Sequence, residues 1–220
     1  MTRTKRVMDV CCSLVGLIVL APLFALVGFA IAVDVRNGRG GPVLFGQERV
    51  GLHGVSFRMW KFRTMVADAE RRGAQLTVGA DPRVTRVGRW LRRLKLDELP
   101  QLLNVLRGEM SLVGPRPEVP RFVALYTEAQ RAVLDLVPGI TDPASIRYRD
   151  EASELARSAD PERCYIEEIM PEKIRINLEY AAHATPWSDF VVVFATLGLI
   201  AGRRASGGTT GALTRSTLGA

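Results

Sequence analysis

Histidine and cysteine are scarce in this chain of 220 residues. Two of the three cysteines, Cys11 and Cys12, sit inside an apolar run and Cys164 stands alone. The sequence therefore predicts neither a disulfide framework nor a cysteine metal cluster. The two histidines, His53 and His183, lie far apart and have no ligand-like neighbours at metal-site spacing, so catalysis by histidine is not favoured.

Glycine-rich nucleotide-binding signatures are also missing. The chain has no GxxxxGK motif, no GxGxxG after a strand pattern and no internal repeat of about 20 to 50 residues. Basic residues are plentiful, since 30 Lys and Arg face 23 Asp and Glu and the net charge is +7. This charge implies an anionic partner: nucleic acid, lipid headgroups or phosphorylated substrates. The 47% hydrophobic content is enough for a real core.

An uncharged apolar run extends from Val10 to Val33. As a continuous helix it would be about 36 Å long, enough to cross a bilayer. Pro22 lies in its middle, where proline removes a backbone hydrogen bond and bends a helix. Both flanks are basic and so favour the cytoplasmic side: Arg3, Lys5, Arg6, Arg36 and Arg39. We therefore expect a re-entrant, helix-break-helix segment over residues 1–36, with a spanning helix as the alternative.

Two later segments have the pattern of membrane-surface helices. The stretch from Pro82 to Lys95 gathers its apolar residues within about a third of the helix circumference and places arginines on the other side. That pattern suits a lipid interface, and although a nucleic-acid-binding helix would carry the same charge, the preceding apolar run favours the membrane. The run from Phe190 to Gly202 is too short to cross a bilayer and is expected in the interface or in the core.

The remaining pattern predicts a helix-dominated α+β domain over residues 37–204. Val43–Val50 and Val55–Phe62 are rich in β-branched and aromatic residues, and Gly51–Gly54 separates them, so a short β-hairpin is predicted. Residues 205–220 are small and polar, and we expect a disordered tail there. The oligomeric state cannot be read from the sequence, and a homo-oligomer stays open.

Two adjacent carboxylates, Asp97 and Glu98, precede a leucine-rich run. One interpretation is a helix start, with Asp as the N-cap and Pro100 in the first turn. At about 100° per residue the leucines share one face, which we expect to be buried in a core. Asp97, Gln101 and Asn104 then line the opposite face, toward solvent or a cleft. From this window alone the cap interpretation is favoured over a catalytic pair.

Cations with preset directions occur at two other places. Lys61 and Arg63 end the second predicted strand on its polar side, in one row. Arg116 lies between Pro115 and Pro117, which fix φ and give its guanidinium a stiff backbone from which to bind a phosphate. Pairing of Arg116 with a surface glutamate is the alternative.

Six motifs, read in order, resemble those of the monotopic phosphoglycosyl transferases, a family of bacterial sugar transferases: KRVMDV, GPVLFGQERVG, FRMWKFRTM, DPRVTRVGRWLRR, LDELPQLLNVLRGEMSLVGPRPE and VPGIT. The resemblance covers Lys5 to Thr141. It implies a monotopic enzyme at the inner leaflet of the cytoplasmic membrane, with its catalytic domain facing the cytoplasm. Such an enzyme moves a sugar-1-phosphate from a UDP-sugar to a polyprenyl phosphate, releases UMP and initiates the assembly of a membrane glycoconjugate.

The resemblance also implies roles for single residues. Asp97 would attack the β-phosphate, Glu98 would help to hold Mg²⁺, and Arg116 would contact phosphate. Lys61 and Arg63 would border the site. These roles agree with physical chemistry, because a carboxylate can attack phosphorus when Mg²⁺ and cations neutralise the diphosphate. The implied partners are a UDP-sugar, a polyprenyl phosphate and membrane lipid, but no nucleic acid.

The chain departs from the family pattern at two places. Ala21 precedes Pro22 where relatives often have Ser, and DPASIRYRDE follows VPGIT where GWAQVNGR is common. We expect the second departure to affect sugar choice or acceptor handling. Two other functions stay open: a membrane-bound phosphohydrolase with Asp97 as nucleophile, and a non-catalytic basic scaffold on the membrane surface. The scaffold would leave LDELPQ and GPRP without a purpose.

Overall fold

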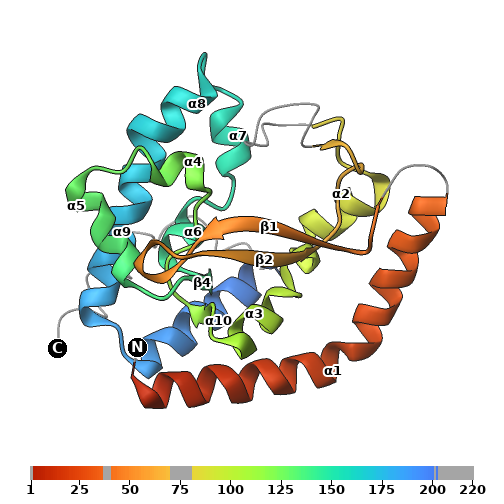
Figure 1. Ribbon diagram of the computed structural model, residues 1–220, viewed down its shortest axis with the longest axis horizontal. Coiled ribbons are helices and arrows are strands. Elements are labelled where there is room, and N and C mark those ends of the chain that lie inside the picture. Colours follow the sequence, from red (N-terminus) through yellow and green to blue (C-terminus); the bar gives the residue numbers. More distant parts are fainter. Residues whose placement is uncertain (1, 37–40, 70–80, 201, 203–220) are drawn as a thin grey trace.

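The computed structural model describes residues 2–36, 41–69, 81–200 and 202, so the expected tail lies outside the described residues. Helices dominate and two small sheets complete an α+β fold, which confirms the predicted class (Figure 1). The helices are α1 Arg3–Arg36, α2 Arg86–Arg93, α3 Gln101–Arg107, α4 Pro120–Val123, α5 Glu128–Arg131, α6 Pro143–Arg147, α7 Glu151–Leu155, α8 Pro161–Cys164, α9 Met170–His183 and α10 Pro186–Ile200. The strands are β1 Leu44–Val50, β2 Ser56–Phe62, β3 Ser111–Val113 and β4 Gly139–Thr141, and the short helical turns are η1 Leu52–Gly54, η3 Leu96–Glu98, η4 Ala132–Asp135 and η5 Tyr165–Ile169.

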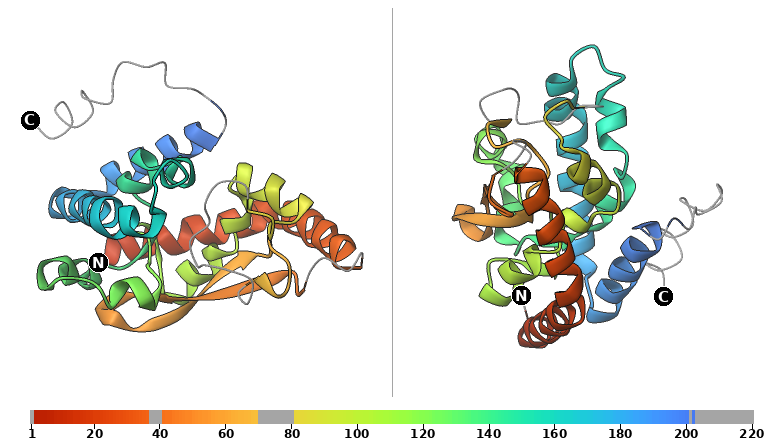
Figure 2. Two further views of the ribbon diagram at one scale, coloured as in Figure 1. Left: turned by 90° about the horizontal axis from the view of Figure 1, so that it is seen from above. Right: turned by 90° about the vertical axis from the view of Figure 1, so that its right-hand side faces the viewer.

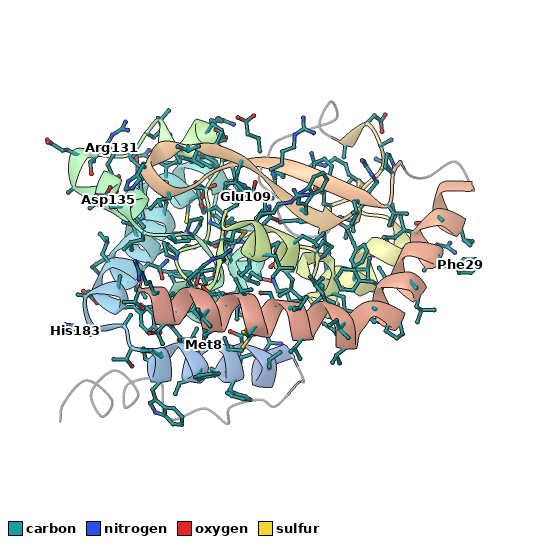
Figure 3. All side chains as sticks on the ribbon, turned by 60° about the horizontal axis from the view of Figure 1, so that its bottom comes forward. Met8, Phe29, Glu109, Arg131, Asp135 and His183 are labelled. Carbon is teal, nitrogen blue, oxygen red and sulfur yellow. The ribbon has the colours of Figure 1, made fainter. Side chains whose placement is uncertain are left out.

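The apolar run forms one continuous helix, α1, with Pro22 inside it. Figure 1 shows α1 bending between two arms, so the chain bends here without leaving the helix, and the expected helix-break-helix is not seen. α1 is long and apolar enough to cross a membrane. Its apolar side chains largely face outward; Ile18 and Phe29, for example, are 66% and 69% exposed (Figure 3). A surface of this kind is suited to lipid.

The first turns of α1 are tied to the rest of the domain. The Asp9 side chain is fully buried and accepts hydrogen bonds from Ser111 Oγ at 2.7 Å and from the Leu112 backbone N–H at 3.2 Å. Lys5 pairs with Asp189 of α10 and donates to the Val113 carbonyl at 3.0 Å. The N-terminal arm of α1 consequently lies beside α10 (Figures 2 and 3).

α10 contains most of the apolar run predicted from Phe190 to Gly202, and its side chains are divided between the core and the exposed surface. Val192 is 7% exposed and packs inward, whereas Trp187 and Phe194 are 76% and 68% exposed. α10 runs beside the N-terminal arm of α1 (Figure 2), and both helices carry exposed apolar side chains.

The predicted β-hairpin is confirmed, with each strand one residue shorter at its start. β1 and β2 pair antiparallel from Leu44 opposite Phe62 to Val50 opposite Ser56, and η1 joins them. Met59 and Phe62 point into the core. His53 in η1 has φ 54°, a left-handed conformation of the kind that closes such turns.

The predicted arginine-rich helix is also present, but it is shorter than the stretch from Pro82 to Lys95. α2 begins after Thr85, whose hydroxyl accepts a hydrogen bond from the Gly88 N–H at 2.9 Å. A Cβ at Gly88 would lie 2.0 Å from the Thr64 carbonyl oxygen, so α2 packs directly on the chain that leaves β2. Lys95, with φ 55°, turns the chain into η3.

Candidate active site

The two adjacent carboxylates lie in η3, between α2 and α3. Asp97 is only 7% exposed, and the N-cap position of α3 belongs to Pro100, which makes no side-chain capping bond. The interpretation of Asp97 as a helix cap on a solvated face is therefore wrong. A helix start does follow the acids, but the 3₁₀ turn places Asp97 before the first α-helical turn and rotates it inward.

The two faces of α3 are the reverse of the expectation. Gln101 and Asn104 are fully buried, whereas the leucines of this segment are half-buried. The leucine face meets α1, since a Cβ on Gly16 of α1 would lie 3.3 Å from the Leu102 side chain. Leu99 packs against a buried cluster that includes Val27 and Ile31 of α1. Amphipathic periodicity finds two faces of a helix but cannot tell which one meets the domain when a long apolar helix covers the other.

Asn104 is engaged in structural hydrogen bonds. Its side-chain oxygen accepts from the Trp60 N–H at 3.0 Å, and its amide nitrogen donates to the Arg58 carbonyl and to Glu109, both at 2.7 Å. These bonds join α3 to β2. Gln101 differs from Asn104, because both polar atoms of its side chain are buried without a partner among the described residues.

Glu98 pairs with two cations from different elements. Arg116 Nη1 donates to Glu98 Oε2 at 3.1 Å, Arg116 Nη2 contacts Oε1, and Lys61 Nζ of β2 lies 3.6 Å from Oε1. Burial alone would raise the pKa of Glu98, but Arg116 and then Lys61 hold that pKa well below its usual value. Burial lowers the pKa of Lys61 to about 8, even though Glu98 opposes this shift. Glu98 is therefore ionised at neutral pH.

Asp97 has the opposite environment. Its Oδ1 is buried without a hydrogen-bond partner among the described residues. Burial, and then the charge of Glu98, raise the pKa of Asp97, while Lys61, Arg92 and Lys95 act against that shift. Two neighbouring carboxylates with pKa values moved in opposite directions are a frequent sign of different chemical roles.

The structure brings Lys61 and Arg116 to the acidic pair and places Arg63 elsewhere. Arg63 Nε donates to the Pro42 carbonyl at 2.8 Å, and its guanidinium lies 5.3 Å from the centre of the Phe45 ring. Lys61 and Arg63 therefore lie close together at the end of β2, but Lys61 contacts Glu98 whereas Arg63 contacts the Pro42 carbonyl and the Phe45 ring.

Arg92 is a residue near the site that the sequence did not single out. It lies at the end of α2, donates from Nε to Thr64 Oγ1 at 2.9 Å and contributes to the potential at Asp97. Its place on the arginine face was visible in the sequence. That face was assigned to lipid as a whole, because periodicity does not identify which arginine turns toward the acids.

A cavity of about 580 Å³ adjoins the acidic pair. Glu98 and Arg116 line it together with Lys95, Tyr148, Lys173 and Asn177. Asp97, Lys61 and Gln101 are not among the residues that line it. The volume is typical of small-molecule sites.

The donor set fits a divalent ion that is shared with phosphate. No group of three or more His, Cys, Asp or Glu side chains in the described part of the chain could hold a metal. Mg²⁺ commonly uses only one or two carboxylates and takes its other ligands from phosphates and water. The ionised Glu98 carboxylate is a ligand of the required type, as is the Asp97 oxygen, which has no hydrogen-bond partner in the described part of the chain.

Fold and site together define an α+β protein with one helix long and apolar enough to cross a membrane, and with a buried acidic pair that is surrounded by cations beside a cavity. Comparison with known proteins gives the family. The chain belongs to the bacterial sugar transferase family, whose model matches residues 1–203.

Three relatives illustrate the range of the family. The chain is 42% identical over 200 residues to an undecaprenyl-phosphate glucose phosphotransferase of Komagataeibacter xylinus, covering 88% of this chain and 35% of the relative. It is 36% identical over 196 residues to a UDP-N-acetylgalactosamine-undecaprenyl-phosphate N-acetylgalactosaminephosphotransferase of Aeromonas hydrophila, covering 89% and 43%. It is 37% identical over 217 residues to the exopolysaccharide production protein ExoY of Rhizobium meliloti (strain 1021), covering 92% and 87%. The chain thus spans less than half the length of the first two relatives.

Proposed function

We propose that this protein transfers a sugar-1-phosphate from a UDP-sugar to a polyprenyl phosphate, giving polyprenyl-diphosphate-sugar and UMP. The observation that carries the proposal is the contrast within the acidic pair. Asp97 has a buried oxygen without a partner among the described residues, beside a Glu98 that two cations hold ionised. The names of the relatives support the reaction class and, in the Aeromonas protein, a UDP-sugar donor.

Asp97 is the nucleophile in this proposal. Its free oxygen forms a bond to the β-phosphorus of the UDP-sugar, the bond from that phosphorus to the bridging oxygen breaks, and UMP leaves with the electron pair. A phosphate oxygen of the polyprenyl phosphate then attacks the same phosphorus and releases the Asp97 carboxylate. Covalent catalysis of this kind divides one transfer into two steps. Glu98 is less suited to attack, because its oxygens are engaged by Arg116 and Lys61.

The cations and Glu98 serve the charge of the substrate. Arg116 exchanges its contact with Glu98 for the phosphoryl oxygens, and Lys61 balances the charge that develops near Asp97. Glu98, once released from Arg116, would hold Mg²⁺ beside the substrate phosphates. The ion would supply positive charge that offsets the charge of the diphosphate and of the leaving UMP.

The proposal includes a place at the membrane. α1 lies in the inner leaflet of the cytoplasmic membrane as a bent, re-entrant helix, with both of its ends on the cytoplasmic side. The bend of α1 supports this arrangement (Figure 1), as do the basic residues on both of its flanks, Lys5 and Arg6 before the apolar run and Arg36 and Arg39 after it. The acceptor's phosphate then lies at headgroup height while its polyprenyl tail stays in the bilayer. The product is the first lipid-linked unit of a membrane glycoconjugate.

The test is a burst experiment with the purified full chain. Enzyme, UDP-sugar and Mg²⁺ without lipid should release about one UMP per active site and add the mass of the phosphosugar to Asp97. Asp97→Asn should abolish both signals, whereas Asp135→Asn, which changes an exposed aspartate of η4, should change neither. Continuous UMP release without lipid would indicate a hydrolase, and no release with any UDP-sugar plus polyprenyl phosphate would indicate a scaffold. An adduct mapped to Glu98 would refute the assignment.

A further inference from the structure

The loop that follows β3 carries a second acid whose role is not explained by the proposed chemistry. Glu118 is two residues after Arg116, yet its carboxylate does not pair with Arg116. Arg116 instead reaches Glu98, while Glu118 points into the protein and its side chain is only 15% exposed. A buried carboxylate with dedicated partners suggests that it holds the loop in place.

Glu118 is held from three directions. Its Oε1 accepts a hydrogen bond from Arg49 Nη1 of β1 at 3.3 Å and another from the Val119 N–H at 2.7 Å. Its Oε2 accepts from the hydroxyl of Tyr165, which is 3% exposed. The backbone carbonyl of Glu118 accepts from the Val50 N–H at 2.9 Å, so the loop is bridged to the hairpin.

The backbone on both sides of Arg116 is fixed by the same neighbourhood. The Pro115 carbonyl accepts from the Gly139 N–H at 2.9 Å, and the Pro117 carbonyl accepts from Arg49 Nη1 at 3.0 Å. A Cβ on Gly139 would lie 2.1 Å from the Gly114 nitrogen, so β4 approaches this loop as closely as glycine allows. The prolines restrict φ, and these bonds determine where the restricted segment points.

Tyr165 is well placed to fix the direction of the Glu118 side chain. It belongs to η5, a π-helical turn, and π-helical turns are often found at functional sites. Its ring packs in the core with the Phe122 ring, with centroids 4.9 Å apart, so its hydroxyl has little freedom. Arg49 is likewise buried, and Glu118 balances its charge. Without Glu118, the guanidinium groups of Arg49 and Arg116 would repel one another.

We propose that Glu118, clamped between Arg49 and Tyr165, is a positioning residue that aims Arg116 at Glu98 and at the substrate phosphate. The expected effect on turnover rests on the proposed function, whereas the effect on the position of Arg116 rests only on the contacts of Glu118. It assigns a purpose to three residues that lie outside the acidic pair: Arg49, Glu118 and Tyr165.

The first test reads the position of Arg116 without any activity. Phenylglyoxal modifies accessible arginines, and the rate at Arg116 is measured by peptide mass spectrometry relative to the exposed Arg163 in the same sample. Tyr165→Phe should raise the relative rate at Arg116 about tenfold, as expected for the loss of one hydrogen bond to a charged group. The matched control is Tyr126→Phe, which removes a hydroxyl from the same core cluster but no hydrogen bond to Glu118. An unchanged rate in Tyr165→Phe would overturn the proposal.

Arg49→Lys provides a second route if Tyr165→Phe does not fold. It keeps the charge next to Glu118 but loses the fork that spans the Pro117 carbonyl and Gln47. It should also raise the relative modification rate at Arg116 severalfold. A folded Arg49→Lys protein with the wild-type rate would count against the clamp in the same way.

The second test uses UMP release and a double-mutant cycle. Tyr165→Phe should lower kcat about tenfold with little change in the KM for the donor, because Arg116 acts mainly in the transition state. In the Arg116→Ala background the same change should cost nothing further, whereas a merely structural role would give the same loss in both backgrounds. A wild-type chain that releases no UMP would refute the proposed function, and the modification rates would still decide the role of Glu118.

Discussion

The two adjacent carboxylates should have opposite effects on stability when each is replaced by its amide. In Glu98→Gln, Lys61 and Arg116 lose their shared anion while the shape of the side chain is kept. Removing one partner of a buried ion pair typically costs about 3 to 5 kcal/mol. The side chains of this cluster are 17% to 24% exposed, so solvent screening favours the lower end, about 3 kcal/mol.

Asp97→Asn removes a charge that the fold disfavours. Burial raises the pKa of Asp97, its Oδ1 has no partner among the described residues, and no helix cap is lost with it. The amide should therefore stabilise the protein by about 1 kcal/mol, as is common for substitutions at strained functional positions. In a domain of this size, 1 kcal/mol shifts Tm by about 2 to 4 °C. We expect a rise of that amount for Asp97→Asn and a fall of about 6 to 12 °C for Glu98→Gln.

The assay is thermal unfolding of both variants in one membrane mimetic across a range of pH. The lowered pKa of Glu98 means that its stabilisation is present above its unfolded value of 4.5 and is lost as the pH falls through the folded value. The raised pKa of Asp97 means that burial of this group costs no stability below 3.8, where it is protonated in both the folded and the unfolded state. The cost grows as the pH rises through the folded value, so the advantage of Asp97→Asn should be largest at neutral pH and vanish in acid. Equal Tm shifts for the two variants, or a fall for Asp97→Asn, would refute this account of the pair.

Three further outcomes follow from the site. UMP release should rise with pH as Asp97 loses its proton and fall above about pH 8 as Lys61 loses its own, and Lys61→Arg should remove the upper limb if that interpretation holds. Arg116→Lys should lose most activity, at least about tenfold, in a folded and membrane-bound protein, because the two-pronged contact is lost; near-normal turnover would reduce Arg116 to a structural ion pair. Cysteines placed at positions 3 and 39 should both be protected from an impermeant reagent in intact cells, and labelling at one end only would mean that α1 spans the membrane.

Much of the fold follows from local patterns. The hairpin was predictable because Gly51 and Gly54 separate two β-rich runs, and the strands observed differ by one residue at their starts. Helix α2 was predictable in place but not in length, since its start is set by the capping bond of Thr85 and its end by the left-handed Lys95. Such limits depend on backbone conformations that periodicity does not encode.

The candidate site was predictable in its residues more than in its orientation. Asp97 and Glu98 were selected through the resemblance to a transferase family, since the residue pattern alone favoured a helix cap, and Arg116 was selected because the two flanking prolines preset its backbone. Their environment could not be inferred, because it depends on contacts between distant segments: Lys61 from the hairpin, and α1 over the leucine face. The clamp on Glu118 was missed for the same reason, since Arg49 and Tyr165 are separated from it by 69 and 47 residues.

The hydrogen bonds between α1 and the rest of the domain make α1 part of the folded structure. Arg6 donates to the carbonyls of Val105 and Leu106, at the end of the helix that follows the acidic pair, and Asp9 is buried against Ser111. A soluble catalytic domain therefore cannot be produced simply by cutting after the apolar run, because the cut removes two polar partners from the interior. In the membrane placement proposed above, the same bonds would make the depth of α1 in lipid determine the height of Asp97 relative to the bilayer surface.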